Sequence, residues 1–433
     1  MSTVVPLRHL GLLRLVALGV NSVIGGGIFI MPAVVAARLG PTSLLAWVAA
    51  AIVVTGVGLS FGRLAALHER SGGPYVYIRH AFGPFVGFQA GWLFCIARIT
   101  AAASLFNGFA RYVGALLPGG SSVVGRTALV LLCAFFVIGV NVAGIRQTST
   151  VANTLAIVKV VPLLILGVAG LFAGDASRLI PVAAEPMEFV RSVLLLIFAY
   201  TGFEIVTLPA EEALRPRRDM PVALAMTIGT VCAVYLLVQA MALGLVDDLG
   251  NQAAPLATAA RILAGGPGLY AMTLVAGLST AGCALASLVG GSRVVYAMAE
   301  ARQLPRTLGA LDPSRRTPVR AILILGGIGA LLAILAAYEW LSAVSAGARL
   351  LLYLACCLAC LRPVRGGAGT AVSGWRDRLT RGIAILTAVV VTGLLTALEP
   401  TEAIAGMIGV TIGIILYLAA RRDRAAAGGG EVR

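Results

Sequence analysis

Long apolar stretches alternate with short polar or basic connections from residue 11 to residue 420. Twelve of the stretches approach or exceed the roughly 20 residues that a helix needs to cross the hydrocarbon core of a bilayer. They lie near residues 11–38, 42–67, 84–110, 124–144, 151–173, 188–211, 221–246, 268–299, 319–337, 341–361, 381–398 and 401–420. We therefore predict an all-α integral membrane protein with twelve transmembrane helices.

Glycine interrupts the first and the sixth predicted span in corresponding places. The first span contains Gly25-Gly26-Gly27, the sixth contains Thr201-Gly202-Phe203, and an alignment without gaps pairs Gly25 with Gly202. Each glycine costs about 1 kcal/mol of helix propensity relative to alanine. Broken helices are tolerated in a bilayer where they line a cavity or are buried in protein. Paired breaks indicate a transporter built from inverted repeats, although two kinked packing helices would give the same pattern.

The two breaks suggest how the chain is divided. We predict a five-plus-five inverted repeat, with discontinuous helices 1 and 6 and the first helices of the two repeats in equivalent positions. The expected parts are a cytoplasmic N-terminus at 1–10, a first repeat at 11–173, a second repeat at 188–361, two further spans at 381–420 and a disordered cytoplasmic tail at 421–433.

Composition agrees with a polytopic membrane protein. Of 433 residues, 59% are hydrophobic and 12% are charged, and the mean hydropathy is +0.96. These values lie outside the range of soluble globular proteins. The net charge of +15 would also suit a nucleic-acid-binding protein, but the arginines gather in alternate loops and in the C-terminal tail. This bias predicts a multi-pass protein of the inner (cytoplasmic) membrane with both termini in the cytoplasm, and no nucleic acid partner.

Three ionisable residues lie deep inside predicted spans. Lys159 is the only lysine among 33 basic residues. A desolvated lysine can release its proton and an arginine cannot, so Lys159 is a candidate for proton coupling, with a fixed countercharge as the alternative. Glu204 lies at the second break, where it could be a protonatable gate, a substrate contact or a paired structural carboxylate. Arg98 is a possible charge partner for it, because buried arginines in a membrane need one.

Metal and enzyme chemistry find no support in the pattern. The seven cysteines are scattered, and His9, His68 and His80 all lie outside the predicted spans. No Cys/His constellation with the spacing of a metal site results, and no nucleophile–base pair is recognisable. We therefore expect no metal, no cofactor and no enzymatic activity.

The motifs at the breaks resemble those of the amino acid–polyamine–organocation superfamily of transporters, which includes bacterial amino acid permeases, L-type exchangers and the arginine/agmatine antiporter. The resemblance runs from about Leu10 to Arg362. Four stretches carry it, at 25–29, 159–162, 198–204 and 292–298.

The resemblance implies where an amino acid would bind. Its carboxylate would meet the amides of Gly25, Gly26 and Gly27. Its ammonium would meet carbonyls of Ser22 and Val23 in helix 1 and of Phe198, Ala199 and Thr201 in helix 6. Phe198 would be the pocket aromatic residue. Lys159 falls where sodium-coupled relatives of this fold bind Na⁺, which implies that no sodium is required.

We therefore predict a secondary active amino acid transporter that works by alternating access, independent of Na⁺ and driven by protons or by exchange. Neutral amino acids are the first expectation. A cationic amino acid or polyamine antiporter, with Glu204 as the recognising acid, is the alternative, and a non-transporting amino acid sensor is a further one. The expected partners are the amino acid, protons and the lipid bilayer, with the protein a monomer or a homodimer.

Overall fold

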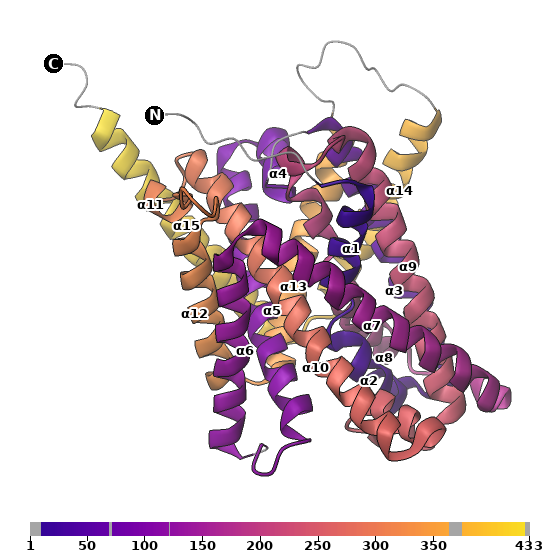
Figure 1. The fold of residues 1–433 in the computed structure, drawn as a ribbon. Helices are drawn as coiled ribbons and strands as arrows, with labels where there is room; N and C mark the ends of the chain where they lie inside the picture. Colours follow the sequence, from indigo (N-terminus) through magenta and orange to yellow (C-terminus); the bar gives the residue numbers. More distant parts are fainter. Residues whose placement is uncertain (1–9, 69–71, 121, 363–374, 429–433) are drawn as a thin grey trace.

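The structure is a computed structural model that describes residues 10–68, 72–120, 122–362 and 375–428 (Figure 1). Within these ranges the regular structure is helical, apart from one isolated parallel bridge between Leu10 and Ala213. The all-α fold class predicted from the apolar pattern is confirmed.

The longer helices follow the predicted spans. Their bounds are α1 (Leu12–Val23), α2 (Gly26–Leu39), α3 (Ser43–Leu67), α5 (Pro84–Gly114), α6 (Val123–Ala143), α7 (Ile145–Ala173), α8 (Pro186–Tyr200), α9 (Pro216–Leu245), α10 (Pro255–Glu300), α12 (Val319–Leu335), α13 (Tyr338–Leu361), α14 (Trp375–Leu395) and α15 (Pro400–Gly428). The short helices are α4 (Pro74–Phe82), α11 (Arg306–Gly309) and the 3₁₀ turns η1 (Gly40–Thr42), η2 (Ala176–Leu179), η3 (Phe203–Thr207), η4 (Ala210–Glu212) and η5 (Leu249–Asn251). A bend at Ala264 and Gly265, whose backbone is not helical, separates the start of α10 from the predicted eighth span.

In the described part of the chain, ten helical stretches are long and apolar enough to cross a membrane. One of them runs from Gly26 to Leu67 and contains both α2 and α3, and the shorter apolar helices are α1 and α12. Each predicted span overlaps at least one helix. The protein is therefore a multi-pass membrane protein, whereas the twelve-span count and the inverted repeat stay predictions.

The helices pack in two groups. In one group, α9 packs against α1 and α3, and α3 packs against α8. In the other, α5 packs against α6, α10, α12 and α13, while α7 joins the groups through contacts with α9 and α10. Helices α14 and α15 pack on the outside, against α3 and α13 and against α5 and α13 respectively. Both breaks lie where the two groups meet.

Helix α1 begins and α15 ends at the same end of the bundle, the end at which α4 and α11 also lie (Figure 1). The connection between α5 and α6 lies at the opposite end. Helix α15 continues to Gly428, through the first part of the segment predicted as a disordered tail; residues 1–9 and 429–433 lie outside the described ranges.

Polarity is distributed as expected for a protein in lipid. Large apolar side chains such as Phe135 on α6 and Ile415 on α15 face outward. Charged side chains, by contrast, lie buried in the interior: Arg98, Lys159 and Glu204 are each at most 2% exposed. Ionisable groups inside a membrane protein are costly, so their arrangement points to the functional centre.

Candidate functional site

The first break is observed where the glycines predict it. Helix α1 ends at Val23, Ile24 and Gly25 have extended backbone conformations, and α2 begins at Gly26. The first amides of any helix lack an acceptor within it, and no side chain in the described ranges caps this one. The start of α2 therefore presents amide hydrogens at the end of the helix where the dipole favours an anion.

The second break follows α8. Thr201 is extended and Gly202 has a left-handed backbone with φ of +118°. A Cβ atom on Gly202 would lie 2.6 Å from the carbonyl oxygen of Ser22, so only glycine suits both the conformation and the close approach. The chain continues as the 3₁₀ turns η3 and η4, not as an α-helix.

The two breaks touch one another. Besides the contact between Gly202 and Ser22, a Cβ atom on Gly27 would lie 2.8 Å from the Cα atom of Ala199. The start of α2 thus crosses the end of α8 at backbone contact distance. The structure thereby brings together in one place the residues for which substrate contacts are predicted, namely Ser22, Val23, Gly25, Gly26, Gly27, Phe198, Ala199 and Thr201.

Lys159 of α7 lies against the end of α1. Its ammonium donates to the carbonyl oxygens of Asn21 (2.8 Å) and Ile24 (2.7 Å) and lies 3.5 Å from that of Ser279 on α10. The side-chain hydroxyl of Ser279 donates to the same Ile24 oxygen at 2.9 Å. The C-terminal end of a helix carries a partial negative charge, which stabilises a cation there. A ring of backbone oxygens around a buried cation is the result.

Two residues that the sequence did not single out bind the remaining carbonyls of this turn. The thiol of Cys283 on α10 donates to Ser22 O at 2.6 Å. The hydroxyl of Tyr235 on α9 lies 3.0 Å from Val23 O and 3.1 Å from Ala199 O. An ordinary tyrosine within an apolar span carries no sequence signal for such a role.

Glu204 is paired with two arginines. Its Oε1 atom lies 3.1 Å from Nη2 of Arg98 on α5 and 3.2 Å from Nε of Arg349 on α13. Its Oε2 atom accepts from the amide of Gly202 (2.9 Å) and from the hydroxyl of Tyr353 (3.2 Å). The question of whether Arg98 reaches Glu204 is thus answered by an ion pair. The carboxylate joins the second break to α5 and α13.

Arg349 is a residue that sequence reasoning missed. Besides Glu204, it contacts the hydroxyls of Thr201 (2.9 Å) and Ser345 (2.8 Å), and it is 2% exposed. A signal existed, because polar residues recur along this otherwise apolar span at helical spacing, at positions 338, 342, 345, 349 and 353. Such a stripe indicates one polar face on a buried helix. The face lies toward Thr201.

The space around the start of α2 is narrow. A Cβ atom on Gly26 would lie 3.3 Å from the hydroxyl oxygen of Tyr338, 3.4 Å from Thr280 and 3.6 Å from Leu105. Phe198 is buried at the end of α8, with 8% of its surface exposed. The side chains that surround the amides are therefore mostly apolar or uncharged.

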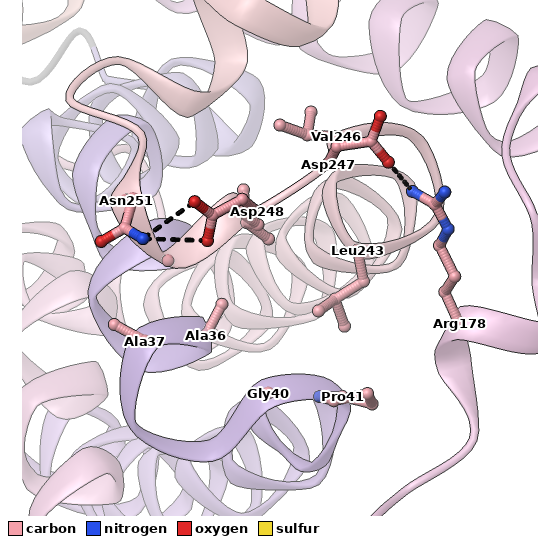
Figure 2. A pocket seen from close by; sticks show the side chains of 12 residues that line it. Ala36, Ala37, Gly40, Pro41, Arg178, Leu243, Val246, Asp247, Asp248 and Asn251 are labelled. Carbon is pink, nitrogen blue, oxygen red and sulfur yellow. Dashed lines mark hydrogen bonds and ion pairs between the residues drawn. The ribbon is translucent and has the colours of Figure 1, made fainter.

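A separate pocket of about 500 Å³ opens at the far end of α2. Figure 2 shows Ala36 and Ala37 on one side and the acidic turn with Asp247 and Asp248 on the other, where Asp247 faces Arg178. At about 1.5 Å per residue, Ala36 lies roughly 15 Å along α2 from the first break. None of the residues predicted to bind substrate lines this pocket.

Comparison with known proteins identifies the family. The profile described as amino acid permease matches residues 10–398. An uncharacterized transporter of Mycobacterium tuberculosis is 35% identical over 331 residues, which cover 75% of this chain and 73% of the relative. The serine/threonine exchanger SteT of Bacillus subtilis is 29% identical over 333 residues (73% and 74% covered), and the branched-chain amino acid permease BcaP of the same species is 26% identical over 349 residues (75% and 74%). Because the matched region contains both breaks and the charged residues around them, the chain belongs to the amino acid permease family, within the amino acid–polyamine–organocation superfamily that its motifs resemble.

Proposed function

We propose that this protein carries neutral amino acids across the cell membrane by alternating access, without Na⁺. The observation that carries the proposal is the ring of carbonyl oxygens around Lys159 at the end of α1. Backbone oxygens of this kind are also what a sodium ion would need. A buried ammonium at 2.7–2.8 Å from two of them fills that position with a charge that belongs to the protein.

The two breaks supply groups for both ends of an α-amino acid. The uncapped amides of Gly26 and Gly27 would bind the carboxylate, as helix N-termini bind anions. The carbonyls of Val23, Ala199 and Thr201 would bind the ammonium. An amino acid placed there would touch both crossing segments at once, so its binding would favour one relative position of the two helix groups.

Buried charge favours a neutral side chain over a cationic one. Glu204 is the acid available to recognise a second ammonium, and it already lies within 3.2 Å of the guanidinium groups of both Arg98 and Arg349. A cationic substrate would have to displace one of them or sit beside it. Among the relatives, SteT is named a serine/threonine exchanger and BcaP a branched-chain amino acid permease, which supports small or apolar substrates.

Coupling to protons and exchange for another amino acid are the two drives that the site allows. In the first, Lys159 would change its protonation during the cycle, because a desolvated lysine can release its proton. Glu204 could share that role if it left its arginines. In the second, Lys159 would keep its charge as a permanent substitute for sodium. The arginine bias of the loops supports an orientation with both termini in the cytoplasm.

Purified protein in proteoliposomes tests these statements together. A panel of labelled neutral and cationic amino acids is offered in Na⁺-free buffer, with or without an inward proton gradient and with or without unlabelled amino acid inside. Accumulation that needs the gradient identifies a proton symporter, and uptake that needs internal amino acid identifies an exchanger. A strict requirement for Na⁺ would overturn the proposal, and binding without flux would indicate a sensor.

A further inference from the structure

Tyr235 connects the two broken helices through a single hydroxyl. The side chain is fully buried on α9, and its oxygen lies 3.0 Å from the last carbonyl of α1, Val23 O, and 3.1 Å from Ala199 O near the end of α8. These two carbonyls converge on one point from the two segments that cross at the proposed substrate site. Tyr235 is outside the set of residues for which the motifs predicted a role.

The ring of Tyr235 is held in place by its neighbours. Trp47 of α3 packs against it edge to face with a centroid distance of 5.2 Å, and Tyr200 of α8 lies at 5.0 Å. Trp47 is itself fixed by a hydrogen bond from its indole nitrogen to Gln239 at 2.9 Å. The hydroxyl therefore cannot move away from the two carbonyls without disturbing this cluster, and its position is set by the fold.

The three oxygens are one proton short. A tyrosine hydroxyl has one hydrogen to donate and can accept through its lone pairs, whereas carbonyl oxygens only accept. At any moment Tyr235 can satisfy Val23 O or Ala199 O, and the other contact brings two acceptors together. Nearby, the buried hydroxyl of Ser22 has no hydrogen-bond partner within the described part of the chain. The surroundings of the break thus lack donors.

We propose that the α-ammonium group of the substrate binds beside the Tyr235 hydroxyl and supplies the missing donors, which makes Tyr235 a substrate-binding residue. One N–H of the ammonium would go to the carbonyl that the tyrosine leaves, and another to the hydroxyl oxygen itself. This inference rests on the proposed amino acid transport and adds to it the group that reads the number of hydrogens on the substrate nitrogen.

The decisive variant is Tyr235→Phe, with Tyr200→Phe as its matched control. Both remove one hydroxyl from the same aromatic cluster, but the Tyr200 hydroxyl donates to Trp47 O at 3.4 Å and touches neither break. We expect Tyr235→Phe to raise the KM for uptake about three- to tenfold, the size of one net hydrogen bond, by the same factor for alanine and for leucine. The maximal rate should change little, and Tyr200→Phe should leave KM near that of the wild type.

N-methylation of the substrate tests the same contact without relying on a variant. In the wild-type protein alanine should compete for uptake better than N-methylalanine, and N-methylalanine better than its dimethyl derivative, because each methyl group removes a donor. In Tyr235→Phe this discrimination should shrink. Equal competition by the three compounds in the wild type, or equal KM shifts in the two tyrosine variants, would overturn the role of Tyr235. A wild-type protein that neither binds nor carries any amino acid would instead overturn the proposed function.

Discussion

Replacing Lys159 by methionine removes the buried ammonium while keeping nearly the same side-chain length. In the structure this ammonium donates at 2.8 Å to Asn21 O and at 2.7 Å to Ile24 O. The variant would leave Asn21 O without this donor, while Ile24 O would keep the bond from the Ser279 hydroxyl. The turn that precedes the first break would thus lose its strongest ties to α7.

The size of the effect follows from the two short bonds. Hydrogen bonds from a charged group contribute about 1.5–3 kcal/mol each, so the pair contributes roughly 3–6 kcal/mol. The cost of burying the ammonium offsets part of this. A net loss of about 3 kcal/mol corresponds to more than a hundredfold decrease in the population of the binding-competent break, and uptake should fall accordingly.

Uptake into proteoliposomes over a range of external pH separates the two possible roles of the charge. Lys159→Arg keeps a cation that cannot release its proton. If Lys159 carries the coupled proton, both variants should lose the pH dependence of uptake. If it is a fixed charge, the arginine variant should retain exchange and the methionine variant should not. A methionine variant with wild-type rate and wild-type pH dependence would remove Lys159 from the mechanism.

Three further predictions concern close contacts, buried charge and substrate choice. Gly27→Ala should abolish uptake, because its Cβ atom would lie 2.8 Å from the Cα atom of Ala199, whereas Gly229→Ala, with nothing within 4 Å, should behave as wild type; normal transport by Gly27→Ala would refute the crossing of the breaks. Glu204→Gln leaves two buried guanidiniums without a carboxylate and should destabilise the protein by about 3–5 kcal/mol in thermal unfolding. Adding Arg349→Gln should recover part of that loss, and a Glu204→Gln protein as stable as wild type would instead support a Glu204 that takes up protons. In competition assays norleucine should inhibit uptake more strongly than lysine, which has a similar length, and the reverse order would refute the preference for neutral substrates.

The two breaks could be predicted because their signal is local. Three successive glycines in an apolar run, and Gly202 at the matching place in the second half, disfavour a continuous helix whatever surrounds them. The conformation after Gly202 could not be predicted in the same way. There the chain forms 3₁₀ turns, held by the amide of Gly202 on Glu204 and by the hydroxyl of Thr207 on the Glu204 carbonyl at 2.7 Å. These bonds depend on arginines from α5 and α13 that hold the glutamate in place.

The charged part of the site was visible in the sequence to different degrees. Lys159 stood out because it is the only lysine, and Arg98 because it lies deep in a span. Arg349 carries the same signal as Arg98 and could have been found by the same argument. Which of these residues meet is another matter, because it depends on how each helix is rotated about its axis. Tyr235 owes its role entirely to such a rotation, which places its hydroxyl between two segments far apart in the chain.

The carbonyls of residues 21–24 connect these observations to transport. A lysine from α7, a thiol and a hydroxyl from α10 and a tyrosine hydroxyl from α9 bind them. An unsatisfied carbonyl inside a membrane protein costs several kcal/mol, so the end of α1 cannot shift alone. A substrate ammonium brings new donors to these oxygens and would lower the cost of a shift, and loss of a proton from Lys159 would change the same bonds. Exchange and proton coupling would therefore act on one set of hydrogen bonds, because a ligand can drive a conformational change only through contacts that differ between the two states.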